Sequence, residues 1–231
     1  RQIDSLSNKY VSFSGKIRYG FSSKDLYGNI SGNIPAGKSN LGFMIGSDVL
    51  DLNNQGSITP LGNSINSLFY ERNYLKLYEK KFVNLSVSRR LSGGLVGTLS
   101  GEWANRKALQ NTTDYTFIDD KTRQFTSNNP FDPLSDADLF PENQSFKMGI
   151  RATYEFSKEY ATYPNGKVYL PSKYPRLGLS YTHSFKNVLG SDTQFDLLSF
   201  DIQKSDISVG LYGKTSFWLG GGKFLNNEHM Y

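Results

Sequence analysis

Apolar and polar residues alternate along this chain over stretches of about 11 residues, and this pattern strongly limits the possible folds. In residues 11–21, aromatic, aliphatic and glycine residues stand at odd positions, and mostly serine, lysine and arginine stand at even ones. A period of two places the two kinds of side chain on opposite faces of a β-strand. About 11 residues let a tilted strand cross a bilayer. The pattern therefore predicts strands with one apolar and one polar face.

The alternation recurs along the chain and predicts about nine or ten strands. The further stretches are residues 26–34, 41–45, 83–88, 95–103, 146–156, 177–185, 198–202 and 207–219, the last two separated by a tight turn near Ser205 and Asp206. Long connections at 49–79 and 106–143 fall on one side of the predicted sheet, and mostly shorter ones on the other. This asymmetry is typical of outer-membrane barrels, with the long loops extracellular. We therefore predict an all-β fold, an antiparallel transmembrane β-barrel, with residues 1–231 as a single partial barrel domain.

Residues 62–79 interrupt the strand pattern. Ile65, Leu68, Phe69, Arg72 and Leu75 follow the i, i+3, i+4 spacing of a helix face, so a short amphipathic helix is expected in this loop. It could rest on the barrel rim or fold over the mouth, but packing within the loop is the plainer interpretation.

Composition excludes several classes of protein. The hydrophobic fraction is 37% and the mean hydropathy is −0.48, and no run approaches the roughly 20 apolar residues of a transmembrane helix. The absence of cysteine excludes disulfides and cysteine-based metal sites. The net charge of +5 is dispersed along the chain, so no nucleic-acid partner is expected.

The chain offers little for catalysis. His183 and His229 are its two histidines, which argues against a histidine triad or a multi-histidine metal site. We interpret His183 as an interfacial residue of its strand. The acidic stretch with Asp132, Asp136 and Asp138 lacks the spacing of an EF-hand. We therefore predict no enzyme activity, no catalytic residues, no metal and no cofactor.

The alternation assigns residues to faces of the barrel. The charged lumen-facing residues are predicted to be Lys16, Arg18, Glu102, Lys147, Arg151, Glu155 and Lys214. The lipid-facing ones are Val11, Phe13, Ile17, Leu99, Met148, Ile150, Val209 and Leu211. An interfacial aromatic girdle is predicted to hold Tyr19, Phe21, Trp103, Tyr154, Phe156 and Phe185. The lumen charges could brace the interior as ion pairs or line a weakly selective pore; on a soluble sheet they would form the solvated face.

Short segments of the sequence resemble a Gram-negative bacterial family that joins a carboxypeptidase-regulatory-like domain to an outer-membrane barrel of uncharacterised role. The matching segments lie at residues 19–28, 73–79, 127–133, 172–182 and 222–227. The family's barrel is similar to the surface-antigen superfamily that includes BamA-type assembly factors. The resemblance implies a complete barrel of about 16 strands, with strands outside this sequence, and supplies no catalytic residues.

These observations predict an integral outer-membrane protein of a Gram-negative bacterium, without catalytic activity, that assists protein assembly or translocation or scaffolds a surface complex. Its partners would be the lipid bilayer and other outer-membrane or surface proteins. Two alternatives stay open: a porin-like passive channel, and a soluble β-sandwich that serves in binding or adhesion.

Overall fold

The computed structural model describes residues 2–4, 9–53, 58–91, 93–118, 120–135, 137, 139–156, 160–163, 166–169 and 172–229. Its main feature is a nine-stranded antiparallel sheet in which each strand pairs with the next along the chain, apart from an inserted hairpin. The strands are β3 (Ser12–Tyr19), β4 (Leu26–Ala36), β5 (Ser39–Asp51), β6 (Leu77–Arg90), β7 (Leu95–Ala108), β8 (Asn143–Glu155), β11 (Arg176–Ser184), β12 (Gln194–Ser208) and β13 (Lys214–His229). The predicted all-β antiparallel fold is confirmed. The sheet is not closed: β3 and β13 are its edges.

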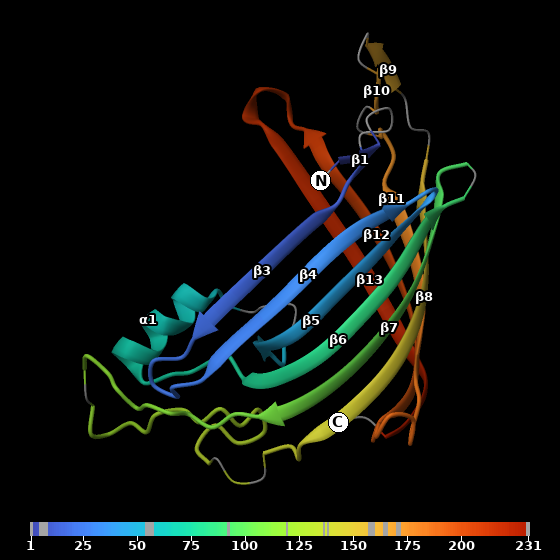
Figure 1. The fold of residues 1–231 in the computed structure, drawn as a ribbon. Helices are drawn as coiled ribbons and strands as arrows, with labels where there is room; N and C mark the ends of the chain where they lie inside the picture. Colours follow the sequence, from blue (N-terminus) through green and yellow to red (C-terminus); the bar gives the residue numbers. More distant parts are fainter. Residues whose placement is uncertain are drawn as a thin grey trace.

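Figure 1 shows the sheet bent into a trough, with β3 and β13 on its two sides and β8 between them. The helix α1 (Pro60–Tyr70) and the long connections lie at one end, which we call the loop end. The hairpin of β9 (Tyr160–Tyr163) and β10 (Gly166–Tyr169) lies at the other, the turn end. A short pair of β1 (Gln2–Asp4) and β2 (Lys9–Tyr10) precedes the sheet.

The polar face of the sheet is the covered one. Ala104, Ser145 and Ser184 are cross-strand neighbours, or nearly so, on β7, β8 and β11, and each is 0% exposed. On the opposite face, Ile17 is 82% exposed and Ile150 is 62% exposed. Because no second layer of sheet packs on either face of the described strands, the difference follows from curvature: the polar side chains converge inside the trough and the apolar ones spread outside.

Most strands are longer than the alternation predicted, although β3 is shorter, and the last hairpin lies elsewhere. The prediction of a strand at 207–219 after a turn at Ser205 and Asp206 is wrong. β12 continues to Ser208 through a register shift between Lys204 and Ile207, and the reversal is made by residues 209–213, including the 3₁₀ turn η1 (Gly210–Tyr212). Val209 and Leu211, predicted to face lipid from a strand, therefore lie in this turn. Positive φ angles at Gly210 and Gly213 permit the reversal.

The loop helix begins and ends earlier than expected. The Thr59 hydroxyl accepts a hydrogen bond from the Gly62 amide at 3.1 Å, Pro60 occupies the first turn, and Glu71 ends the helix in the left-handed conformation with φ of 60°. Residues 77–79, expected in the helix, begin β6. The two long connections accordingly span 52–76 and 109–142. No helix in the described part of the chain is long and apolar enough to cross a membrane.

Candidate functional site

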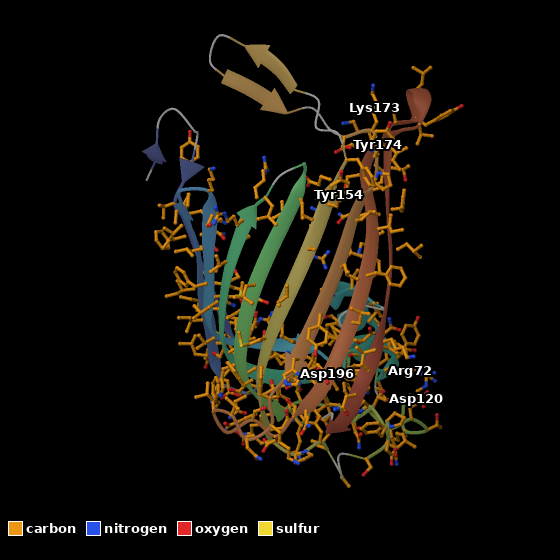
Figure 2. All side chains as sticks on the ribbon, turned by 90° about the vertical axis from the view of Figure 1, so that its right-hand side faces the viewer. Arg72, Asp120, Tyr154, Lys173, Tyr174 and Asp196 are labelled. Atoms are coloured by element: carbon orange, nitrogen blue, oxygen red, sulfur yellow. The ribbon has the colours of Figure 1, made fainter. Side chains whose placement is uncertain are left out.

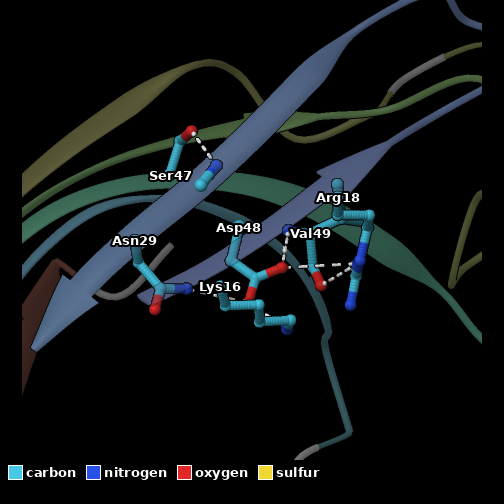
Figure 3. Close-up of polar contacts among 7 residues, drawn as sticks. Lys16, Arg18, Asn29, Ser47, Asp48 and Val49 are labelled. Carbon is cyan, nitrogen blue, oxygen red and sulfur yellow. Dashed lines mark hydrogen bonds and ion pairs between the residues drawn. The ribbon is translucent and has the colours of Figure 1, made fainter. Parts of the chain in front are cut away.

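Three ion-pair groups cross the inner face of the trough, and the first is centred on Asp48. Its carboxylate lies 2.6 Å from Lys16 Nζ and 3.3 Å from Arg18 Nη1, both on β3, and accepts a hydrogen bond from Asn29 Nδ2 on β4 (Figure 3). Asp48 is buried, whereas the two cations are about half exposed. The pairing couples β3 to β5 across the whole width of β4.

The second group is centred on Glu102, on β7. One carboxylate oxygen lies 2.8 Å from Lys80 Nζ on β6, and the other lies 2.8 Å from Lys147 Nζ on β8. All three side chains are at most 20% exposed. A single carboxylate thus neutralises two ammonium groups that would be costly to cover unpaired.

The third group joins Arg151 on β8 to Asp201 on β12, across the intervening strand β11. The strand between them contributes Gly178 at this point, and a methyl group there would collide with both the guanidinium and the carboxylate. Glycine at this position of β11 therefore leaves room for the ion pair to cross the strand in this geometry. Each of the three groups connects three consecutive strands of the sheet. Such contacts stabilise the curvature of the sheet.

Two more residues of the predicted lumen-facing set, Glu155 and Lys214, lie apart from these groups, and two residues of the groups, Asp48 and Lys80, were not predicted. Glu155 stands opposite Arg176 in the register near the turn end. Lys214 is 68% exposed and lies 3.3 Å from Asp206 beside the last turn, away from the three groups. The prediction missed Asp48 and Lys80, because the strands were ended too early on either side of the 52–76 connection. The alternation gives no signal for Lys80, because Phe82 is apolar at an even position and Lys81 is charged at an odd one.

Aromatic residues on the outer face form rows near both ends. At the loop end, Trp103 and Phe146 are cross-strand neighbours, and Phe185 donates its backbone N–H to the Phe146 carbonyl. At the turn end, the rings of Tyr154 and Phe156 pack edge to face at 4.7 Å. Figure 2 places Tyr154 near the turn end. Tyr19 and Phe21 also pack edge to face, with ring centroids 5.2 Å apart, where β3 reaches the loop end.

His183 lies on the outer face beside the loop-end row. Its ring packs edge to face on Phe185 at 4.3 Å, and its Nδ1 is 2.6 Å from the carboxylate of Asp196. The Tyr181 hydroxyl donates to the same carboxylate at 2.5 Å. The hydrogen-bonding groups of His183 and Asp196 therefore find their partners within the sheet. The described residues hold no group of three or more histidine, cysteine, aspartate or glutamate side chains that could bind a metal ion.

A buried amide fixes the 109–142 connection to the ends of β6 and β7, and a lysine fixes it to the 52–76 connection. Asn128 donates from Nδ2 to the carbonyls of Leu77 and Leu109, and its Oδ1 accepts the Leu77 amide at 2.7 Å. The Lys76 ammonium donates to the Ser127 carbonyl at 2.5 Å. The segments 73–79 and 127–133, which carried part of the family resemblance, are thus brought into contact. Of the acidic stretch, Asp136 and Asp138 lie outside the described residues.

Side-chain hydrogen bonds to backbone amides also hold α1 in place. Asn63, in its first turn, accepts the backbone amides of Tyr74 and Leu75 at 2.7 and 3.0 Å. The carboxylate of Glu71, which is buried, accepts the Asp120 amide at 3.0 Å. Hydrogen bonds from the Thr122 hydroxyl and backbone amide lower the pKa of Asp120 below its usual value. The connections therefore form an ordered layer at the loop end.

A cavity of about 950 Å³ lies between this layer and the inner face of the sheet, at the loop end of the strands. Arg18 and Tyr27 line it from the sheet, Ser67 lines it from α1, and Gln110 and Tyr115 line it from the 109–142 connection. Its lining combines aromatic, amide and charged side chains.

The fold and this site define an all-β protein whose curved antiparallel sheet is ion-paired inside, apolar outside and covered by ordered loops at one end. The chain belongs to the family of unknown function DUF5686: the model of that family's C-terminal domain matches residues 1–231. No curated protein and no solved structure matches the chain.

Proposed function

We propose that this sheet is one wall of a β-barrel in the outer membrane of a Gram-negative bacterium, with its apolar outer face against lipid. The observation that carries the proposal is the reversal of faces: the polar side of the sheet is covered and the apolar side is open. Large apolar side chains are exposed across the outer face from β4 to β12, including Ile30, Leu85, Leu99, Ile150, Leu179 and Phe200. An apolar surface that crosses so many strands is far larger than soluble monomers expose.

The spacing of the aromatic rows supports this proposal. Phe146 and Phe156 are ten residues apart on β8 and the residue that follows it. At about 3.3 Å per residue and a strand tilt of about 40°, this separation spans about 25 Å along the membrane normal. Outer-membrane barrels have an apolar band of about this height between their aromatic girdles.

A closed barrel also resolves the two unpaired sheet edges. The strands β3 and β13 present backbone donors and acceptors that lipid cannot satisfy. We propose that further strands pair with both, to give the barrel of about 16 strands that the surface-antigen resemblance implies. Within that barrel, the three braced ion-pair groups would face the lumen and the loop layer would face the cell exterior.

We propose a non-catalytic role for this barrel, as a scaffold in a surface complex or as an aid to protein assembly or translocation. The supporting observation is the loop layer, which is fixed by side-chain hydrogen bonds and so offers a preformed surface to a partner.

A passive channel is the second candidate, favoured by the excess of cations in two of the inner groups: two cations meet one carboxylate at Asp48 and again at Glu102. Planar-bilayer recordings of the full-length protein distinguish the two roles. Stable conductance with a preference for anions would support the channel, and an electrically silent barrel would support the scaffold.

The membrane proposal itself is tested by fractionating cells that express the full-length protein and by comparing gel mobility with and without boiling. Recovery in the outer membrane with faster migration of the unboiled sample is the expected result. Recovery as a soluble monomer without detergent would overturn the proposal and favour a soluble binding domain.

A further inference from the structure

The cavity at the loop end has walls that are tied together. The Ser22 hydroxyl, in the turn between β3 and β4, donates to the Thr112 carbonyl at 2.9 Å. The Phe117 amide donates to the Leu68 carbonyl of α1 at 2.8 Å. Three separate connections therefore border one open cavity, and a ligand that entered it would not have to order them first. Preorganisation of this kind favours binding.

The lining combines aromatic rings with neutral hydrogen-bonding groups. Tyr27, Tyr115, Phe125 and Phe140 contribute rings, and Gln110 contributes an amide. Tyr115 is 62% exposed, so its ring is accessible. Aromatic faces pack against apolar C–H surfaces, whereas an amide both donates and accepts hydrogen bonds and so matches a hydroxyl group. A ligand that presents both kinds of surface is a sugar ring.

The positive and negative charges of the lining are equal in number, and Arg18 and Glu142 have partners in the structure. Arg18 pairs with Asp48, which lies outside the lining, at 3.3 Å, and donates to the Val49 carbonyl at 3.1 Å. Glu142 accepts the Asn105 side-chain amide at 2.8 Å. The two other charged residues of the lining, Lys107 and Asp25, contribute one positive and one negative charge. A lining without net charge gives no electrostatic preference for an anionic ligand.

We propose that this cavity binds a neutral oligosaccharide. Its volume of about 950 Å³ lies at the upper end of the range for small-molecule sites, which favours several linked rings over a single sugar. A peptide is the competing occupant, because aromatic-lined grooves also bind proline-rich peptides, and the titration below includes a peptide to distinguish the two. The inference goes beyond the proposed function and does not depend on where the sheet resides.

The test is calorimetric titration of the full-length protein, in a detergent without a sugar headgroup, with maltohexaose, cellohexaose, xylohexaose and mannohexaose. Hexagalacturonate serves as the anionic comparison, and an unstructured decapeptide as the peptide comparison. We expect at least one neutral hexasaccharide to bind, and the Tyr115→Ala variant to weaken that binding by about tenfold or more. Tyr174→Ala, which removes an exposed tyrosine at the turn end, should leave it unchanged.

Gel mobility of each variant, with and without boiling, separates loss of folding from loss of the site. The proposal is overturned if the folded protein binds none of the neutral hexasaccharides, if it binds only hexagalacturonate or the peptide, or if Tyr115→Ala and Gln110→Ala both bind as the parent does.

Discussion

Replacing Ile150 by arginine tests which face of the sheet meets lipid. Ile150 lies midway between Phe146 and Tyr154 on β8, on the outer face, opposite Leu99 on β7 and Tyr181 on β11. If this face is in the membrane, Ile150 is close to the midplane, and arginine there should reduce the free energy of unfolding by roughly 2–4 kcal/mol. If the face is in water, a residue already 62% exposed should change stability by no more than about 0.5 kcal/mol.

The matched control is Ser100→Arg, on the inner face of the neighbouring strand. Ser100 stands opposite Gly149, so the new side chain would extend into the trough, close to the carboxylate of Glu102. We expect a cost below about 1 kcal/mol. Arg151→Ile is a poor control, because it would leave Asp201 without its ion-pair partner.

Urea titration of both variants in lipid vesicles, followed by tryptophan fluorescence, measures the two costs. A larger cost for Ser100→Arg than for Ile150→Arg, or equal costs, would refute the assignment of faces.

Four further changes follow from the contacts. Glu102→Gln leaves two covered ammonium groups without a carboxylate and should cost roughly 3 kcal/mol in the same titration; a cost equal to that of Glu142→Gln at the rim would contradict the bracing role. Gly178→Ala would displace the flexible ends of Arg151 and Asp201 and should cost no more than about 1 kcal/mol; a larger loss would show that the pair is held rigidly across β11. Asn128→Ala removes three hydrogen bonds that fix the 109–142 connection to Leu77, at the start of β6, and to Leu109, just after β7, and should speed trypsin cleavage within 109–142; an unchanged rate would refute that docking. The lowered pKa of Asp120 implies that its contribution to loop order is present above the pKa of the unfolded chain and is lost as the pH falls through the lower folded pKa. The protection factor of the Thr122 amide, its exchange rate relative to that of an unstructured peptide at the same pH, should therefore fall only under acid, and Asp120→Asn should remove that dependence.

The sequence predicted the strands well where alternation is regular. Residues 146–156 were assigned to a strand that closely matches β8 because apolar and small residues occupy every even position there. The last hairpin was misplaced because Ile207, Val209 and Leu211 continue the alternation into a turn that is set by glycine backbone angles. Periodicity records which side chains could share a face, but it does not record where the backbone reverses.

The candidate site was less predictable. Glu102 and Lys147, which pair with each other, lie on strands whose alternation was clear, and both were predicted. Their third member, Lys80, was missed. The docking of each long connection onto neighbouring backbone depends on Asn63 and Asn128, which bond to backbone groups up to 51 residues away along the chain. No periodic pattern marks such residues, because a buried amide in a loop is fixed by tertiary contacts rather than by its neighbours in sequence. The cavity follows from that docking and was therefore not foreseen.

The most direct test of the membrane account uses the absence of cysteine from these 231 residues. Single cysteines introduced in the full-length protein at each position from 147 to 152 of β8 would carry a nitroxide label, and its accessibility to oxygen and to a water-soluble nickel complex would be measured in lipid vesicles. The account predicts an alternation of period two, with positions 148, 150 and 152 accessible to oxygen and shielded from nickel. Nickel accessibility at those three positions, or no alternation, would contradict it.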